Sequence, residues 1–211
     1  MRRASAAVLL ALLAVPFPLA AANKSVYGPE VPGDSAFVRI VNAAAGSAKL
    51  SAELGATTWE PLGFAEASAY KPVTPDIYSF TAGGREVEII PGSGRYYTVA
   101  VLPKDIVVLE DPAHTDPARA QLFLYNFSAL PRVELATADG KTTVIPAVRP
   151  GSSGLAVVNA VAAKLAVRSG GAQLKAIGDL GLARGSSFSV FVLGEAGSAT
   201  VFTLKAAVKA E

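Results

Sequence analysis

Two short stretches hold the residue types of a serine enzyme that cleaves esters or transfers acyl groups. Gly33-Asp34-Ser35 offers a serine, and Asp111-Pro112-Ala113-His114 offers an Asp-x-x-His pair far downstream. In such enzymes the histidine takes the serine proton and the aspartate orients the histidine. The chain has one histidine, so any Ser–His catalysis has to use His114.

The elements that would position these residues do not suit that chemistry. A nucleophilic serine needs a tight turn after a strand, with an oxyanion site close by. Ser35 instead precedes the apolar stretch 36–42, and residues 28–32 (GPEVP) before it are extended and Pro-rich. His114 lies in a segment that is typical of a solvated linker. We predict a turn at Gly33-Asp34 and no catalytic residue, with a Ser35-based esterase as the enzymatic alternative.

Metal and cofactor sites are not indicated. With one His and no Cys, only carboxylate oxygens remain as ligands, and the acidic residues lack the spacing of a calcium loop. The glycine-containing segments 151–154 and 181–185 most simply form turns. We therefore expect neither a metal nor a cofactor.

The first 22 residues have the pattern of an export signal. Arg2-Arg3 precedes a short apolar run, which ends in the small residues Leu19-Ala20-Ala21-Ala22. This order is that of a cleaved secretory signal peptide, and the run is too short to span a bilayer comfortably. We expect cleavage after Ala22 and a periplasmic protein that does not itself span the membrane; an uncleaved anchor is the alternative.

Removal of this segment makes the chain electrically neutral. Arg2 and Arg3 would leave with it, so the 19 basic residues become 17, equal to the 17 acidic ones. The remaining charge gives no reason to expect binding to nucleic acid. Without cysteine there are no disulfides, so stability has to come from burial of apolar surface.

The apolar pattern alternates with period two or forms short runs between Gly, Pro, Asn and Asp, which predicts β-strands. The first series of expected strands is 36–42, 48–53, 76–81, 85–90, 95–102 and 105–109. The second series is 120–126, 132–137, 141–146, 154–159, 162–168, 172–177, 186–193 and 198–206. Gly83-Gly84 and Asp139-Gly140 predict hairpin turns, and a short helix near 160–165 is a weak alternative.

The two series resemble each other. AFVRIVN at 36–42 and AQLFLYN at 120–126 are both apolar strands that end on Asn, and each series closes on a long apolar strand. We therefore predict an all-β chain of two tandem β-sandwich domains, Ig-like or jelly-roll-like. The expected boundaries are a signal peptide at 1–22, domains at 23–110 and 120–211, and a linker at 111–119. One larger sandwich is the alternative.

The halves differ in charge. Residues 23–116 carry 7 basic and 12 acidic side chains, and residues 117–211 carry 10 and 5. This asymmetry is consistent with two different partners, or with attraction between the halves. If the second half binds an anionic polysaccharide, the candidate residues are Arg132, Lys141, Lys164 and Arg168.

Two stretches carry a resemblance to a known family. Residues 26–42, VYGPEVPGDSAFVRIVN, and residues 136–142, ATADGKT, resemble the AlgF family of periplasmic alginate O-acetylation proteins. The resemblance implies a protein that is not itself the acetyl-transferring enzyme. It implies an adaptor between a membrane-bound O-acyltransferase and periplasmic acetyltransferases of the Gly-Asp-Ser type. The Gly-Asp at 33–34 is not a required feature of the family, which weakens a catalytic interpretation of Ser35.

The segment from Tyr27 to Asn42 is our candidate for the contact with a partner, because an extended Pro-rich lead can lie along another protein or add to a sheet edge. Alternatively, its first residues only fix the N-terminus to the first sandwich. The candidate partner-binding residues are Tyr27, Gly28, Pro29, Asp34, Ser35, Arg39 and Asn42.

Overall fold

The computed structural model describes residues 31–46 and 49–209. All regular structure in these residues is β-strand, as the sequence predicts. The described part of the chain has no helix of the length and apolar character that a membrane crossing requires. The expected signal peptide lies outside the described residues.

The N-terminal half is a sandwich of two sheets. Its inner sheet contains β4 (Glu66–Ala67), β5 (Lys71–Val73), β1 (Ala36–Asn42), β8 (Tyr96–Val101) and β9 (Ile106–Asp111). Its outer sheet contains β3 (Thr57–Leu62), β2 (Leu50–Leu54), β6 (Tyr78–Ala82) and β7 (Arg85–Ile89). Alternate residues of β1 and β8 pack on buried side chains of β2 and β6, which forms the first hydrophobic core.

The C-terminal half repeats this arrangement. Its inner sheet has the order β13 (Ser152–Val158), β10 (Ala120–Ser128), β16 (Ser187–Gly194) and β17 (Thr200–Lys205). Its outer sheet has the order β12 (Thr143–Val148), β11 (Val133–Thr137), β14 (Lys164–Ser169) and β15 (Ala172–Asp179). In each half the first strand pairs in parallel with the next-to-last, β1 with β8 and β10 with β16. The weak sequence repeat therefore corresponds to a repeated topology.

The same hydrogen bond in both halves explains why each first strand ends on an asparagine. Asn42 Nδ2 donates to the carbonyl of Leu62 at 3.0 Å, and Asn126 Nδ2 donates to the carbonyl of Val148 at 3.1 Å. Leu62 and Val148 are the last residues of β3 and β12, the matching edge strands of the two outer sheets. Each asparagine is fully buried and ties an inner sheet to an outer one.

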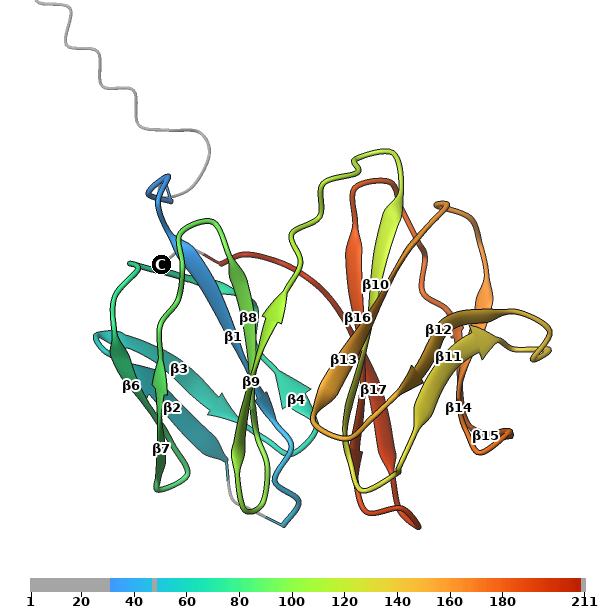
Figure 1. The fold of residues 1–211 in the computed structure, drawn as a ribbon, viewed down its shortest axis with the longest axis horizontal. Helices are drawn as coiled ribbons and strands as arrows, with labels where there is room; N and C mark the ends of the chain where they lie inside the picture. Colours follow the sequence, from blue (N-terminus) through green and yellow to red (C-terminus); the bar gives the residue numbers. More distant parts are fainter. Residues whose placement is uncertain (1–30, 47–48, 210–211) are drawn as a thin grey trace, which may run out of the picture.

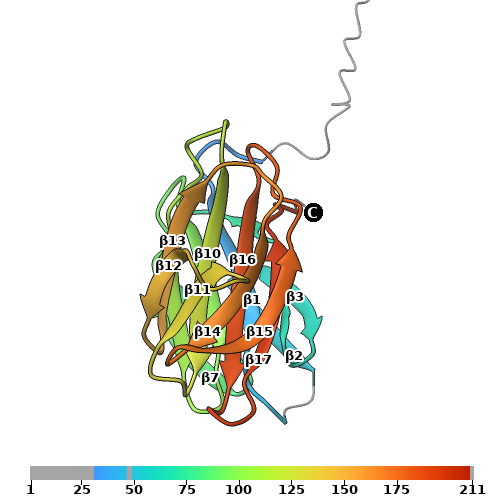
Figure 2. The same ribbon diagram turned by 90° about the vertical axis from the view of Figure 1, so that its right-hand side faces the viewer.

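The two inner sheets pack against each other, so the molecule has four layers (Figure 1). Figure 2 views the stack from its C-terminal outer sheet. A third core fills the space between the halves, with the buried residues Val41, Ala43, Ala100, Phe123, Tyr125, Phe127, Phe191 and Leu193. The Phe191 ring stacks on Tyr125 and on Phe202 at 4.8 Å in both cases. Each such pair stabilises the fold by about 0.5–1.5 kcal/mol beyond the contribution of its buried surface area.

The end of the chain crosses back to the first half. Tyr70 forms a parallel bridge with Val208, its amide donates to the carbonyl of Ala207 at 2.9 Å, and its carbonyl accepts from Lys209 at 2.8 Å. The segment after β17 thus spans both halves, whereas the predicted boundaries assign all of 120–211 to the second. Those boundaries as independent domains stay a prediction.

The sequence identified most strands but missed three. The stretch 36–42 coincides with β1, and β6 and β7 join at Gly83-Gly84, both at positive φ. The missed strands are β3, β4 and β5. β3 contains Pro61, which an edge strand tolerates, and β4 and β5 have two and three residues. Residues 159–163 lie outside any strand and form no helix, so the alternative of a short helix near 160–165 is wrong.

Replacing Asn126 by alanine should destabilise the protein strongly. The change leaves the buried carbonyls of Leu130 and Val148 and the amide of Ser128 without this partner. We expect a loss of about 2 kcal/mol or more in the free energy of unfolding, measured with urea. The control Asn159→Ala, at an exposed position, should change it by less than about 0.5 kcal/mol. Equal effects of the two changes would contradict the structural role of Asn126.

Candidate functional site

The most unusual side chain of the fold is the fully buried Arg39 in the middle of β1. Successive residues of a strand face opposite sides, so Val38 and Ile40 enter the first core while Arg39 faces the C-terminal inner sheet. Arg39 Nε donates to Thr98 Oγ1 and Nη2 donates to the Tyr125 hydroxyl, both at 2.8 Å. The guanidinium therefore touches both halves of the molecule.

Aromatic rings surround the guanidinium. Its central carbon lies 4.6 Å from the ring centre of Tyr70, 5.3 Å from that of Tyr125 and 5.2 Å from that of Phe191. A cation over an aromatic face is attracted by the ring quadrupole, and more strongly when water is excluded. These contacts offset part of the cost of burying the charge.

The negative charge that balances Arg39 is Asp111, the last residue of β9. Its carboxylate lies 3.8 Å from Arg39 Nη2, and both side chains are 1% exposed. It accepts hydrogen bonds from the hydroxyls of Tyr70 at 2.8 Å and Tyr125 at 2.6 Å, and a third from Thr98. We call Arg39, Tyr70, Thr98, Asp111 and Tyr125 the buried polar network. The sequence placed Asp111 in a linker; the structure corrects this to a buried strand residue.

Burial also sets the protonation of the two tyrosines. Burial raises the pKa of Tyr125 well above its usual value, although the charge of Arg39 acts in the opposite direction. The pKa of Tyr70 is raised for the same main reason. Burial acts to lower the pKa of Arg39, but interactions with Tyr125, Tyr70 and Asp111 outweigh it and the pKa is raised. At neutral pH both tyrosine hydroxyls are therefore protonated and donate to the carboxylate of Asp111.

The residues considered for catalysis do not form a catalytic set. Ser35 is 4% exposed and closes a turn in which its amide donates to the carbonyl of Pro32 at 3.0 Å, as predicted for Gly33-Asp34. The carboxylate of Asp111 is occupied by the buried polar network. Within the described residues His114 Nε2 has no hydrogen-bond partner, so no bond there joins it to Asp111 or Ser35.

The candidate partner-binding residues divide into three groups. Tyr27, Gly28 and Pro29 lie outside the described residues. Asp34 is exposed in the turn, whereas Ser35, Arg39 and Asn42 are buried, and Arg39 and Asn42 make internal side-chain bonds. In this fold those three lie inside the protein, and surface contact is available to Asp34.

The candidate polymer-binding cations lie on the C-terminal outer sheet and its loops, in two pairs. Arg132 and Arg168 line one depression, where Arg168 Nε lies 3.7 Å from Glu134. The second depression lies between Lys141 and Lys164 and also contains Asp139. The Arg168 guanidinium also lies beside Gly140, next to Lys141 in the chain. Nothing in the fold assigns them a ligand.

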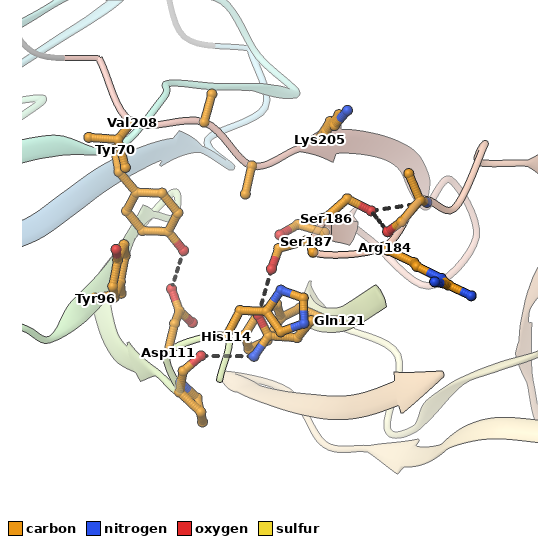
Figure 3. Close-up of a pocket in the computed structure, with 17 residues that line it drawn as sticks. Tyr70, Tyr96, Asp111, His114, Gln121, Arg184, Ser186, Ser187, Lys205 and Val208 are labelled. Carbon is orange, nitrogen blue, oxygen red and sulfur yellow. Dashed lines mark hydrogen bonds between the residues drawn. The ribbon is translucent and has the colours of Figure 1, made fainter. Parts of the chain in front are cut away.

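A pocket of about 370 Å³ lies between the halves, beside the buried polar network (Figure 3). Tyr70, Tyr96 and Asp111 line it from the N-terminal half, and the opposite wall comes from β10, β16, the loop before β16 and the returning end of the chain. Ser187 Oγ donates to Gln121 Oε1 at 2.6 Å, and Gln121 Nε2 donates to the carbonyl of Pro112 at 2.9 Å. The walls combine aromatic, small apolar and neutral polar residues, and the charged residues Asp111, Arg184 and Lys205 also belong to the lining.

Sequence reasoning missed this pocket and most of the network. Arg39 stood among the candidates, but as a surface contact and without its partners. The available signal was a single charge inside the apolar stretch AFVRIVN. Such a charge on a strand that is otherwise buried requires a partner nearby.

Fold and network together define a protein of two like β-sandwiches, joined face to face through an apolar core and a buried polar network. The family model described as alginate O-acetyl transferase AlgF matches residues 7–189. Alginate biosynthesis protein AlgF of Pseudomonas aeruginosa is 31% identical over 207 residues, which are 97% of this chain and 94% of that protein. The protein of the same name from Azotobacter vinelandii is 30% identical over 191 residues, with coverages of 90% and 87%. The chain belongs to the AlgF family.

A domain of a relative is among the solved structures that match. It is the C-terminal domain of AlgF from P. aeruginosa, with 32% identity over 42% of this chain and 98% of that domain, and a TM-score of 0.39.

Replacing Arg39 by methionine should destabilise the protein more than loss of any exposed ion pair. The change leaves the buried Asp111 charge without its counterion, which typically costs about 3–5 kcal/mol. Urea unfolding of Arg39→Met measures this loss. Arg95→Met is the control, because Arg95 and Glu110 form a 2.9 Å pair with side chains 59% and 48% exposed. We expect a loss of at most about 1 kcal/mol for the control.

The double variant Arg39→Met/Asp111→Leu tests the same interaction from the other side. Removing both charges should recover much of the stability lost in Arg39→Met, because no uncompensated charge remains. If Arg39→Met costs no more than Arg95→Met, the buried charge pair contributes no more to stability than an exposed one.

Stability should also fall at alkaline pH. A group whose pKa is raised in the folded protein contributes stability below its unfolded value, about 10 for tyrosine, and loses it as the pH rises through the folded value. We expect the free energy of unfolding to decrease above about pH 10. Replacing Tyr125 by phenylalanine should reduce the slope of this decrease. An unchanged slope would show that Tyr125 does not titrate on unfolding.

Proposed function

We propose that this protein is a non-catalytic accessory protein of alginate O-acetylation. It is exported to the periplasm, where it connects a membrane-bound O-acyltransferase with periplasmic acetyltransferases. The observation that carries the non-catalytic part is the use of Asp111. Its carboxylate oxygens accept from three hydroxyls and pair with Arg39, which leaves His114 without an orienting acid.

The four-layer arrangement supports a connecting role. The outer sheets face away from each other, so two partners can contact the protein at the same time (Figure 1). On the N-terminal outer sheet, β2, β3 and β7 carry four exposed acids: Glu53, Glu60, Glu86 and Glu88. We call this surface the acidic outer face. It suits a partner with a basic surface, because opposite charges attract the partner over several ångströms.

The test of the accessory role is complementation. A strain that lacks the gene should make alginate with little acetyl ester, and the wild-type chain should restore it. Ser35→Ala should restore acetylation to at least about half of the wild-type level, because this side chain performs no chemistry. Near-complete loss with this variant, while it remains folded and exported, contradicts the non-catalytic proposal.

The acidic outer face can be tested separately by charge reversal. Glu53→Lys combined with Glu86→Lys should lower the recovery of a partner acetyltransferase on the tagged protein by about tenfold or more at low salt, because like charges now repel. Glu195→Lys, the same change on the other half, is the matched control. An equal loss with the control, or no loss with the double variant, would assign the contact to another surface.

Direct binding of the anionic polymer is the second candidate. The two pairs of cations, Arg132 with Arg168 and Lys141 with Lys164, favour it because each lines a depression of the C-terminal outer sheet. Retention on immobilised alginate should then decrease steeply with salt, because screening weakens charge attraction. No retention at low salt would exclude this candidate.

A further inference from the structure

The pocket between the halves contains two polar atoms that the fold does not use. Ser189 on β16 is fully buried, lines the pocket, and its Oγ has no hydrogen-bond partner among the described residues. His114 lines the same pocket, and its Nε2 is likewise buried and unpartnered there. A buried polar atom without a hydrogen-bond partner costs free energy. Two such atoms at one pocket therefore indicate that a ligand in the pocket supplies the missing partners.

The surroundings of these atoms are apolar and aromatic. Phe123 and Tyr70 are 4% and 5% exposed, and Tyr96 is held in place by stacking on Phe37 at 4.5 Å. The pocket volume of about 370 Å³ lies at the small end of the range for ligand pockets, about 300–1,000 Å³. The pocket therefore suits a small ligand with an apolar part and few polar atoms.

The charges at the pocket favour an uncharged ligand. Asp111 is neutralised by Arg39. The charged ends of Lys205 and Arg184 point away from the centre of the pocket in Figure 3. The Lys205 ammonium lies 6.0 Å from the ring centre of Phe188, which is a core residue of the C-terminal sandwich. A carboxylate in this pocket would lose its hydration without gaining a free cation, which is costly.

We propose that this pocket binds one acetyl ester group of an acetylated sugar unit. The methyl group packs against the aromatic wall of Tyr96 and Phe123. The Ser189 hydroxyl donates to the carbonyl oxygen of the ester, and His114 Nε2 bonds a hydroxyl of the sugar. This inference rests on the proposed function, since it names the group that an accessory protein of O-acetylation recognises.

The experiment uses the isolated full-length mature protein and three small probes. They are a methyl hexoside with one acetyl ester, the same glycoside without the ester, and acetate ion. Amide shifts in two-dimensional NMR of the 15N-labelled protein report where each probe binds and how tightly. We expect saturable shifts at residues 183–187 and Gln121, with the acetylated glycoside bound at least tenfold more tightly than the other two probes.

Two variants test the assignment. Ser189→Ala removes the donor and should weaken binding about three- to tenfold, which corresponds to one hydrogen bond. Ala183→Trp places a large side chain at an exposed position of the pocket wall and should abolish the shifts without disturbing a core. Ser35→Ala is the matched control, because Ser35 is a buried serine outside the pocket. Thermal melts confirm that each variant is folded.

Several outcomes overturn the proposal. Equal affinity for both glycosides would mean that the ester is not recognised, and tighter binding of acetate would make the pocket an anion site. Unchanged affinity in folded Ser189→Ala, or shifts confined to other residues, would remove the site from this pocket. The proposed function can fail separately: it predicts that partners are recovered on the tagged protein, which requires no small probe.

Discussion

The burial of one charge pair between the two inner sheets is the constraint on which the structure depends. Arg39 and Asp111 both belong to the N-terminal inner sheet, yet Tyr125 of the C-terminal half bonds both of them. If the halves separated, the pair would lose this partner and the rings of Phe123, Phe127 and Phe191 would meet water. Apolar contact alone allows many relative positions, whereas a buried ion pair with fixed hydrogen bonds permits few. We infer that the network selects one orientation of the halves.

That orientation has consequences on both sides of the interface. It directs the two outer sheets away from each other, and it creates the pocket where the inner sheets meet the returning end of the chain. The bridge between Tyr70 and Val208 adds a backbone link at the same place, and the hydroxyl of Tyr70 belongs to the network. Partner surfaces, pocket and stability are therefore coupled through a small set of side chains.

The sequence predicted the strands better than the site because the two depend on information of different range. Alternation of apolar residues is local, so 36–42 and the two glycine hairpins could be identified from short windows. Pro61 argued against a strand at β3, because proline is tolerated only where its missing N–H would face no neighbouring strand. The sequence does not show that β3 is such an edge strand. Asp111 was assigned to a linker because Asp-Pro and nearby acids suggest solvent. Its partners Tyr70 and Tyr125 lie 41 and 14 residues away.

The sequence by itself determined an all-β chain, a turn at Gly33-Asp34, and the family. It also determined an internal repeat, in which the first strand of each half ends on an asparagine. These follow from composition, periodicity and short motifs, which a chain carries before it folds. Only the tertiary structure decided that Arg39 is internal, that Asp111 balances it, and that Ser189 and His114 share a pocket. The physical reason is that the environment of a polar side chain is created by residues distant in sequence, and burial turns each such contact from optional into necessary.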